Sequence, residues 1–211
     1  MSQNKLALVS VSDKQGLVGF AKGLPDLGFT ILSTGGTAKV LRAEGIPVTD
    51  VSQYTGFPEI LGGRVKTLHP KIYGGILARS TSSDQAEILQ HNIEHIDLVV
   101  VNLYPFSATV DKGATFEEAI EQIDIGGPSM LRAAAKNHQR VTVVADTFDY
   151  LRVFRELQHG DTSLGFRMYL AAKVFNLMAR YEQSIFDWFR YQVDDDSLNL
   201  QLAQLAAETR K

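Results

Sequence analysis

The feature that most constrains the fold is an alternation of short β-branched or aliphatic runs with longer segments of helical apolar spacing. The predicted strands are Leu6–Val9, Thr30–Leu32, a brief piece around Val48, Leu98–Val101 and Val141–Val144. The LVVV run of the fourth strand is apolar throughout, as in a strand that is covered on both faces. Strands separated by helices are typical of parallel sheets. The sequence therefore predicts an α/β fold, a three-layer α/β/α sandwich with a mainly parallel, doubly wound sheet.

The segments between these strands have the apolar spacing of helices. The predicted helices are Gly16–Leu27, Thr37–Ala43, Asp84–His91, Phe116–Ile123, Pro128–Lys136 and Phe148–Leu157. An aromatic helix from Phe166 to Tyr191 is expected to pack in the core or between two copies of the chain. We expect one compact domain over residues 1–192 that includes these C-terminal helices. Residues 193–211 are expected to be a tail or a truncated linker.

Composition narrows the class of protein. The chain has no cysteine, which excludes disulfides, a thiol nucleophile and thiolate metal sites. A net charge of -3 argues against a general nucleic-acid surface. The start of the chain lacks a secretory pattern, and no apolar run approaches the roughly 20 residues that span a bilayer. We therefore expect a cytoplasmic protein that binds neither nucleic acid nor membrane, with a small-molecule ligand.

The nonapeptide GGRVKTLHP, residues 62–70, is the strongest local signal for a ligand. Glycines let the backbone approach a ligand closely, while Arg64, Lys66 and Thr67 supply charged and neutral donors for phosphate oxygens. The alternative interpretation is a solvated basic loop, and this segment alone does not decide between them.

Other polar segments directly follow the predicted strands, where parallel sheets bind their ligands. They are Ser10 to Lys14, Ser33 to Thr37 and Asn102 to Phe106. The STGGT turn opens a helix, and free N–H groups at a helix N-terminus favour phosphate. An ordinary strand-to-helix turn explains the glycines equally well. The turn matches neither GxGxxG nor GxxxxGK[ST], so the dinucleotide and P-loop signatures are missing.

Two further residues stand at the ends of a predicted helix. Asp124 precedes the glycine turn IDIGG, and Lys136 ends the helix in AAAKNH. A carboxylate before a helix is often only a cap, and a lysine at the other end often only complements the helix dipole. A metal site at His91 and His95 is not expected, because the HNIEH segment has no evident third ligand. We expect no metal and no cofactor.

Six motifs, in order along the chain, closely resemble the IMP cyclohydrolase family, within the methylglyoxal synthase-like superfamily. They are SVSDK, STGGT, GGRVKTLHP, NLYPF, IDIGG and AAAKNH. In that family the activity usually forms the N-terminal half of a bifunctional purine biosynthesis protein, and the resemblance covers about residues 5–192. The transformylase domain of those proteins is not seen here, so we expect the cyclohydrolase activity alone.

The resemblance implies ring closure of the formylated aminoimidazole carboxamide ribotide to IMP, without metal or redox cofactor. It implies an acid/base pair in which the Asp124 carboxylate orients the Lys136 ammonium, with Lys66 and Tyr104 positioning the reacting groups. The implied substrate-binding residues hold the ribose phosphate and neighbouring atoms, with Asn102 reading the base and N–H groups near Gly126 and Gly127 facing the oxyanion. They are Ser10, Ser12, Asp13, Lys14, Thr34, Gly35, Gly36, Thr37, Arg64, Thr67, Asn102, Ile125, Gly126 and Gly127.

Two other functions of the same superfamily are alternatives. One is a methylglyoxal synthase-like lyase acting on a triose phosphate, and the other is a nucleotide-binding regulatory module without chemistry. The lyase has no need of Lys66, Tyr104 and the AAAKNH segment, and a binding module has no need of Asp124 and Lys136. The family also suggests a homodimer.

Overall fold

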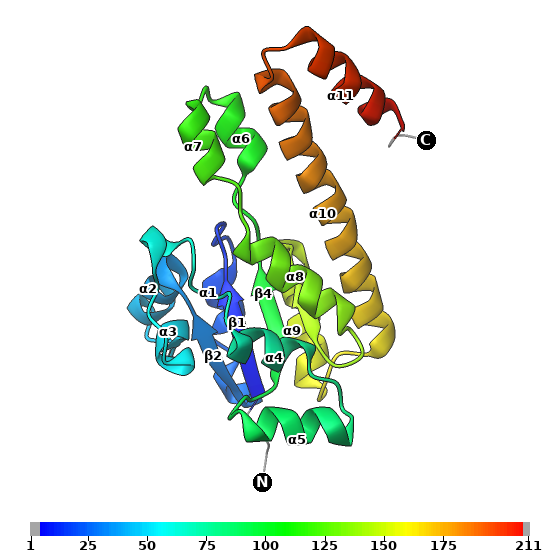
Figure 1. Ribbon diagram of the computed structural model, residues 1–211. Coiled ribbons are helices and arrows are strands. Elements are labelled where there is room, and N and C mark those ends of the chain that lie inside the picture. The colour runs from blue at the N-terminus through cyan, green and yellow to red at the C-terminus, as the bar shows by residue number, and fades with distance from the viewer. Residues whose placement is uncertain (1–4, 209–211) are drawn as a thin grey trace. The chain divides into compact units, whose positions relative to one another are not determined.

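The computed structural model describes residues 5–208 and contains one five-stranded sheet in that part of the chain (Figure 1). The strands are β1 (Lys5–Ser10), β2 (Phe29–Ser33), β3 (Thr49–Asp50), β4 (Ile96–Val101) and β5 (Thr142–Val144). All neighbouring pairs are parallel, and the order is β3-β2-β1-β4-β5. The chain adds strands first on one side of β1 and then on the other. The predicted doubly wound, mainly parallel sheet is confirmed.

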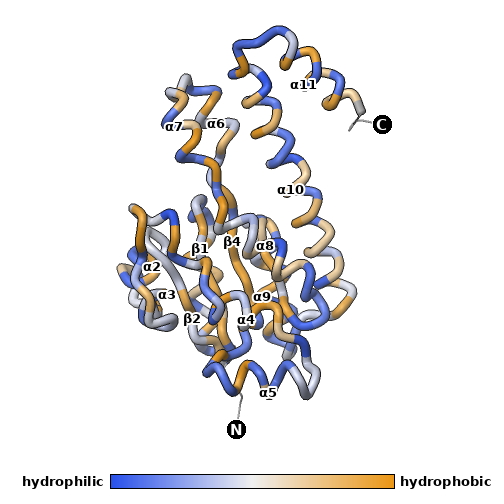
Figure 2. Tube along the Cα trace, viewed as in Figure 1, coloured by the Kyte–Doolittle hydropathy of each residue, from blue (hydrophilic) through white to orange (hydrophobic). Residues whose placement is uncertain are grey.

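The central strands are apolar because helices cover both faces of the sheet. Residues 6–9 of β1 and 98–101 of β4 are at most 2% exposed, and Figure 2 shows β4 in the colours of hydrophobic residues. Burying such side chains contributes about 1.5–3 kcal/mol each. The carboxyl ends of β1 and β4, which are neighbours in the sheet, mark the point where the direction of winding reverses.

Helices α4 (Pro70–Leu77) and α8 (Gly126–Lys136) pack together on one face, against β4 and β5. Helices α1 (Leu17–Ala21), α2 (Gly35–Ala43) and α9 (Tyr150–Gln158) form the other layer. There the ring of Phe20 stacks on Tyr150 at 4.7 Å between centroids and meets Phe154 edge-on. These contacts hold α1 and α9 together.

Most sequence-predicted elements are present, with shifted ends. Gly16–Leu27 is split into α1 and a short 3-10 turn, Pro25–Leu27, because Pro25 interrupts the helix. Helix α5 (Ser82–Gln90) lies where predicted and buries none of its residues. Four helices in the described chain were not predicted: α3 (Val51–Thr55), α4, α6 (Phe106–Asp111) and α11 (Asp196–Glu208). Helices α3 and α6 are too short for a clear apolar period, and α4 starts within the segment interpreted as an anion loop.

The described chain divides into two compact units. One contains the sheet and comprises the described residues up to Tyr104 together with Asp124–Phe175; the other comprises Pro105–Ile123 and the described residues from Asn176 onward. The long helix α10 (Leu164–Gln192) contributes to both. All residues that the sequence analysis assigned to the site belong to the first unit.

The second unit is built around the side chain of Trp188. Its ring meets Phe106 of α6 edge-on at 5.7 Å and stacks on Phe116 of α7 (Phe116–Glu121) at 5.3 Å. The segment expected to be a tail or linker contains helix α11 (Asp196–Glu208), whose first N–H groups bond to the Asp195 carboxylate. Residues 209–211 lie outside the described residues. The domain boundary at residue 192 stays a prediction.

Candidate active site

The loops after β1 and β4 meet at the point where the sheet reverses its winding. The side-chain oxygen of Asn102 accepts hydrogen bonds from the N–H groups of Ser12 (2.6 Å) and Asp13 (3.0 Å), and its amide nitrogen donates to the Asp13 carbonyl at 2.8 Å. An asparagine amide carries two N–H donors. One donor of Asn102 therefore remains for a ligand, and the rest of its amide fixes the loop.

Hydroxyl groups join the first two strand ends, and this limits what they can offer a ligand. Ser10 and Thr34 share a hydrogen bond of 3.0 Å. Thr37 is 4% exposed, accepts the Val11 N–H and donates its only hydroxyl proton to the Val11 carbonyl at 3.0 Å. In this structure the Thr37 hydroxyl therefore has no proton left for a phosphate, because a threonine hydroxyl has one proton to donate. That Thr37 binds the substrate stays a prediction.

The backbone at the start of α2 is better placed for an anion. The first bond inside the helix runs from the Ala38 N–H to the Thr34 carbonyl. This leaves the N–H groups of Gly35, Gly36 and Thr37 directed out of the first turn, where the helix dipole favours negative charge. Gly35 and Gly36 are exposed. Because Gly35 has φ of 46°, glycine suits this turn.

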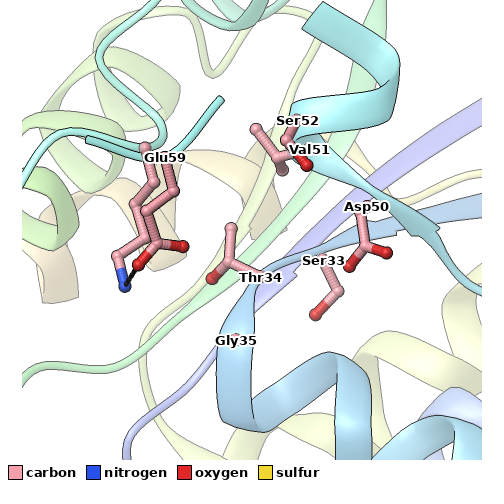
Figure 3. A pocket seen from close by; sticks show the side chains of 8 residues that line it. Ser33, Thr34, Gly35, Asp50, Val51, Ser52 and Glu59 are labelled. Carbon is pink, nitrogen blue, oxygen red and sulfur yellow. Dashed lines mark ion pairs between the residues drawn. The ribbon is translucent and has the colours of Figure 1, made fainter. Parts of the chain in front are cut away.

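A hollow opens beside this turn, and Figure 3 shows the side chains that line it. Thr34, Gly35 and Lys66 were predicted site residues. Ser33 belongs to the STGGT segment but was not assigned to the site, and the sequence analysis missed Asp50, Val51, Ser52 and Glu59. Asp50 ends β3, and Val51 and Ser52 directly follow it. The rule that ligands bind after parallel strands would have found them, had it been applied to this short strand as well.

Lys66 lies at the end of a tight loop that begins at Glu59. Ile60 and Val65 form an isolated antiparallel bridge, with N–H to carbonyl distances of 3.1 and 3.4 Å. The loop between them has positive φ at Leu61, Gly62 and Gly63. The Lys66 ammonium is 3.2 Å from the Glu59 carboxylate, the ion pair drawn in Figure 3.

Asp124 caps the start of α8. Its carboxylate accepts the Gly127 N–H at 2.8 Å. A Cβ on Gly127 would collide with that carboxylate and would come within 3.0 Å of Leu103, so the turn requires glycine and packs against the loop after β4. A Cβ on Gly126 would lie 3.1 Å from the Thr67 hydroxyl. The GGRVKTLHP and IDIGG motifs are therefore in contact.

Electrostatics connect Asp124 to Lys66. Burial raises the pKa of the Asp124 carboxyl, while hydrogen bonds from the Gly127 and Gly126 N–H groups and the positive charge of Lys66 oppose that rise. Two of the four predicted catalytic residues thus interact through their charges in this structure. A carboxylate whose proton affinity is raised by burial, beside an ammonium, is a common arrangement for proton transfer.

A hydrogen-bonded pair from α4 and α8 supports the same turn. The Tyr73 hydroxyl and the Ser129 hydroxyl are 2.5 Å apart, and Ser129 also donates to the Gly126 carbonyl at 3.0 Å. Ser129 has only one proton, so Tyr73 is the donor to Ser129. Burial raises the pKa of the Tyr73 hydroxyl, and the negative charge of Asp124 adds to this rise.

Lys136 is not close to Asp124 within one chain. Asp124 precedes the first residue of α8 and Lys136 is its last, and the helix has 11 residues. At about 1.5 Å per residue this separates their Cα atoms by roughly 16 Å or more, beyond the combined reach of the two side chains. The expectation that the Asp124 carboxylate orients the Lys136 ammonium is therefore wrong for a single chain. Lys136 is exposed.

The remaining predicted residues surround the same edge of the sheet. Lys14 bends back to the carbonyls of Val11 and Ser12, and Tyr104 is 49% exposed directly after Leu103. Arg64 and Ile125 are also exposed. His69, which precedes α4, uses its side chain to accept the Lys71 N–H and so acts as the helix cap.

Among residues 5–208, no group of three or more His, Cys, Asp or Glu side chains is arranged to hold a metal ion. No helix in that range is both long and apolar enough to cross a membrane.

Comparison with known proteins places these features in a family. A family model described as MGS-like domain matches residues 16–129, and one described as AICARFT/IMPCHase bienzyme matches residues 134–210. Proteins named bifunctional purine biosynthesis protein PurH are similar to this chain. The relative from Magnetococcus marinus is 57% identical over 192 residues, 89% of this chain, and the one from Rhodospirillum rubrum is 56% identical over 194 residues, 90% of this chain.

The chain spans only part of those relatives, 36% of the first and 37% of the second. A crystal structure of a protein named ForH is similar over its whole length. It shares 38% sequence identity with a TM-score of 0.79, covering 89% of this chain and 100% of the other.

Proposed function

This chain belongs to the MGS-like domain family, and from that premise we propose that it is an IMP cyclohydrolase of purine biosynthesis. The proposal is supported by the bienzyme family model over residues 134–210 and by the relatives named PurH. The reaction closes the six-membered ring of the formylated aminoimidazole carboxamide ribotide. The carboxamide nitrogen attacks the formyl carbon, a C–N bond forms, and the formyl oxygen leaves as water.

This chemistry makes three demands on a site. A carboxamide nitrogen is a weak nucleophile, so the formyl group must be held in attack geometry. The negative charge that develops on the formyl oxygen needs donors in fixed positions. Protons must leave the nitrogen and reach the departing hydroxyl. Side chains and N–H groups can meet these demands by holding the formyl group, donating to its oxygen and exchanging protons.

The observation that carries the proposal is the contact of the GGRVKTLHP segment, at Thr67, with the turn that opens α8, where the charge of Lys66 acts on the Asp124 carboxyl. Lys66 supplies an ammonium for the developing charge on the formyl oxygen. Asp124, with its pKa raised by burial, exchanges protons with the reacting amide. The Gly126 and Gly127 N–H groups, which the resemblance assigned to the oxyanion, bond to the Asp124 carboxylate in this structure and therefore act through Asp124. Tyr104 follows the neighbouring loop and positions the carboxamide.

Substrate binding uses residues that follow β2 and β4 at the same edge of the sheet. The outward N–H groups of Gly35, Gly36 and Thr37 suit the phosphate, with Lys14 and Arg64 adding positive charge. Asn102 has one N–H left for the base. The other predicted substrate-binding residues shape the loops that hold these donors.

Lys136 keeps its proposed catalytic role on the basis of the resemblance alone. Because about 16 Å separates the two ends of α8, Lys136 can join Asp124 only from a second copy of the chain. We propose a homodimer, which light scattering would test directly. We also propose a cytoplasmic location, with residues 1–192 as the cyclohydrolase domain and residues 193–211 as a tail or linker.

The alternatives lack a supporting observation. A triose phosphate lyase and a regulatory nucleotide-binding module share the sheet and the phosphate turn. The buried Asp124 beside Lys66 is more than nucleotide binding requires, and the relatives named PurH favour purine chemistry. Neither alternative is needed to explain any residue of the site.

The test is an absorbance assay for IMP formed from the formylated ribotide. The wild type should form IMP. The control variant Lys22→Ala, which replaces an exposed lysine at the end of α1, should form it as well. Asp124→Asn and Lys66→Met should lower kcat by about 10²-fold or more, because each removes a group used in the transition state. Absence of IMP above the uncatalysed rate in the wild type would reject the function. Binding of IMP without turnover would favour the regulatory module.

A further inference from the structure

Glu59 is held opposite Lys66 by the backbone of the loop between them. Because Ile60 pairs with Val65 in an antiparallel bridge, the residues just outside that bridge, Glu59 and Lys66, are cross-strand neighbours. Their charged groups are 3.2 Å apart. The backbone of the loop therefore places the two side chains where they can form this ion pair.

Gly63 is a second sign that the loop is shaped around this ion pair. A Cβ at Gly63 would lie 2.6 Å from the Glu59 carboxylate oxygen and 3.2 Å from the Lys66 ammonium. Its φ of 94° is also a conformation that favours glycine. The Glu59–Lys66 ion pair thus lies directly over Gly63, which leaves room for it because it has no side chain.

The pair also lies where the proposed chemistry occurs. Both side chains line the hollow beside the STGGT turn (Figure 3), and the charge of Lys66 reaches Asp124. A lysine side chain has four rotatable bonds and loses much rotamer freedom when it is fixed in place. The ion pair with Glu59 restricts the ammonium of Lys66 to this side of the hollow, from where its charge acts on Asp124.

We propose that Glu59 is a positioning residue for Lys66, a counter-ion that aims its ammonium at the reacting atoms. The proposal rests on the proposed cyclohydrolase function. As a positioning residue, Glu59 does not touch the substrate and acts only through Lys66. Its loss should therefore lower kcat, leave KM nearly unchanged, and have no effect once Lys66 has been removed.

The first experiment is a double-mutant cycle on IMP formation with Glu59→Gln, Lys66→Met and the double variant. Glu44→Gln is the control, because Glu44 is an exposed carboxylate at the end of α2. We expect Glu59→Gln to lower kcat about tenfold or more with KM within about twofold, since small misplacements of a catalytic group are costly. In the Lys66→Met background the same change should alter kcat by less than about twofold. Equal effects in both backgrounds would overturn the proposal.

The second experiment does not depend on the activity. Brief treatment with acetic anhydride, followed by peptide mass spectrometry, measures the labelling of Lys66 relative to exposed Lys22 in the same sample. Release from a partly exposed ion pair should raise Lys66 labelling about two- to fivefold in Glu59→Gln and not in Glu44→Gln. Unchanged labelling would also overturn the proposal.

These two readouts separate the possible failures. A wild type that forms no IMP rejects the proposed function, while the labelling still decides whether Glu59 holds Lys66. A lowered urea midpoint in Glu59→Gln together with additive kinetic effects would show that Glu59 only stabilises the loop.

Discussion

Arg140 joins the end of α8 to the end of α4 through five hydrogen bonds. Its guanidinium donates to the carbonyls of Gly75, Ile76, Ala78 and Ile96, and it pairs with the Asp97 carboxylate at 2.9 Å. The Arg140 side chain is 14% exposed and that of Asp97 28%. The change Arg140→Met keeps most of the aliphatic stem and removes all five bonds.

The expected loss of stability follows from the acceptors that Arg140→Met leaves without their donor. The carbonyls of Ile76 and Ala78 keep a donor, because the Asn137 amide also bonds to them at 2.7 and 3.0 Å. Asp97 loses its charged partner and keeps only a long bond from the Leu6 N–H. Removing one member of a buried ion pair costs about 3–5 kcal/mol. Since Asp97 is partly exposed, we expect the lower end, about 3 kcal/mol, which lowers Tm by about 6–12 °C.

The penalty should depend on pH. Burial raises the pKa of the Asp97 carboxyl, and the Arg140 charge opposes that rise, so removal of the guanidinium raises this pKa further. A folded-state pKa above the unfolded value stabilises the fold at low pH, and this contribution is lost as pH rises through the folded pKa. The difference between Arg140→Met and the wild type should therefore be largest at pH 7 and smaller at pH 4.

Urea unfolding followed by far-UV circular dichroism at both pH values measures this difference. Arg155→Met is the matched control, because it removes the same charge from an exposed position on α9. It should change stability by less than about 0.5 kcal/mol. A penalty for Arg140→Met that is the same at pH 4 and pH 7 would refute the assignment to Asp97. A penalty no larger than that of the control would refute the buried network.

Three other outcomes are expected. Lys136→Ala should lower kcat by about 10²–10⁴-fold while IMP still binds, with Lys22→Ala unchanged; near-normal kcat would remove Lys136 from the mechanism. Arg64→Ala should raise KM more than it lowers kcat. Thr37→Val should mainly lower the free energy of unfolding in urea, by about 1–3 kcal/mol, because it leaves the buried Val11 N–H and carbonyl without their partner; the reverse pattern would restore the Thr37 hydroxyl to the phosphate site. IMP formation should survive exhaustive chelation with EDTA, and a lasting tenfold loss that added divalent metal restores would contradict a metal-free reaction.

The sequence by itself determined the sheet and the chemistry-bearing motifs. Apolar runs such as Leu98–Val101 are readable because a strand covered on both faces needs no polar residues. The parallel order then follows from helices between the strands, and it places the residues after each strand at one edge. The GGRVKTLHP segment could be picked out from its glycines and its charged and hydroxyl donors, whereas Asp124 was assigned to the site only by the family resemblance.

Only the tertiary structure decided which of those residues meet. Periodicity places Asp124 and Lys136 on one helix, but the rise of that helix, about 1.5 Å per residue, separates them. Thr37 carries a hydroxyl that could bind phosphate, yet this hydroxyl is hydrogen-bonded to the backbone of Val11 because the two loops pack together. The partnership of Glu59 with Lys66 depends on a bridge between Ile60 and Val65. Such pairings depend on backbone register and packing across loops, which residue type and spacing along the chain do not specify.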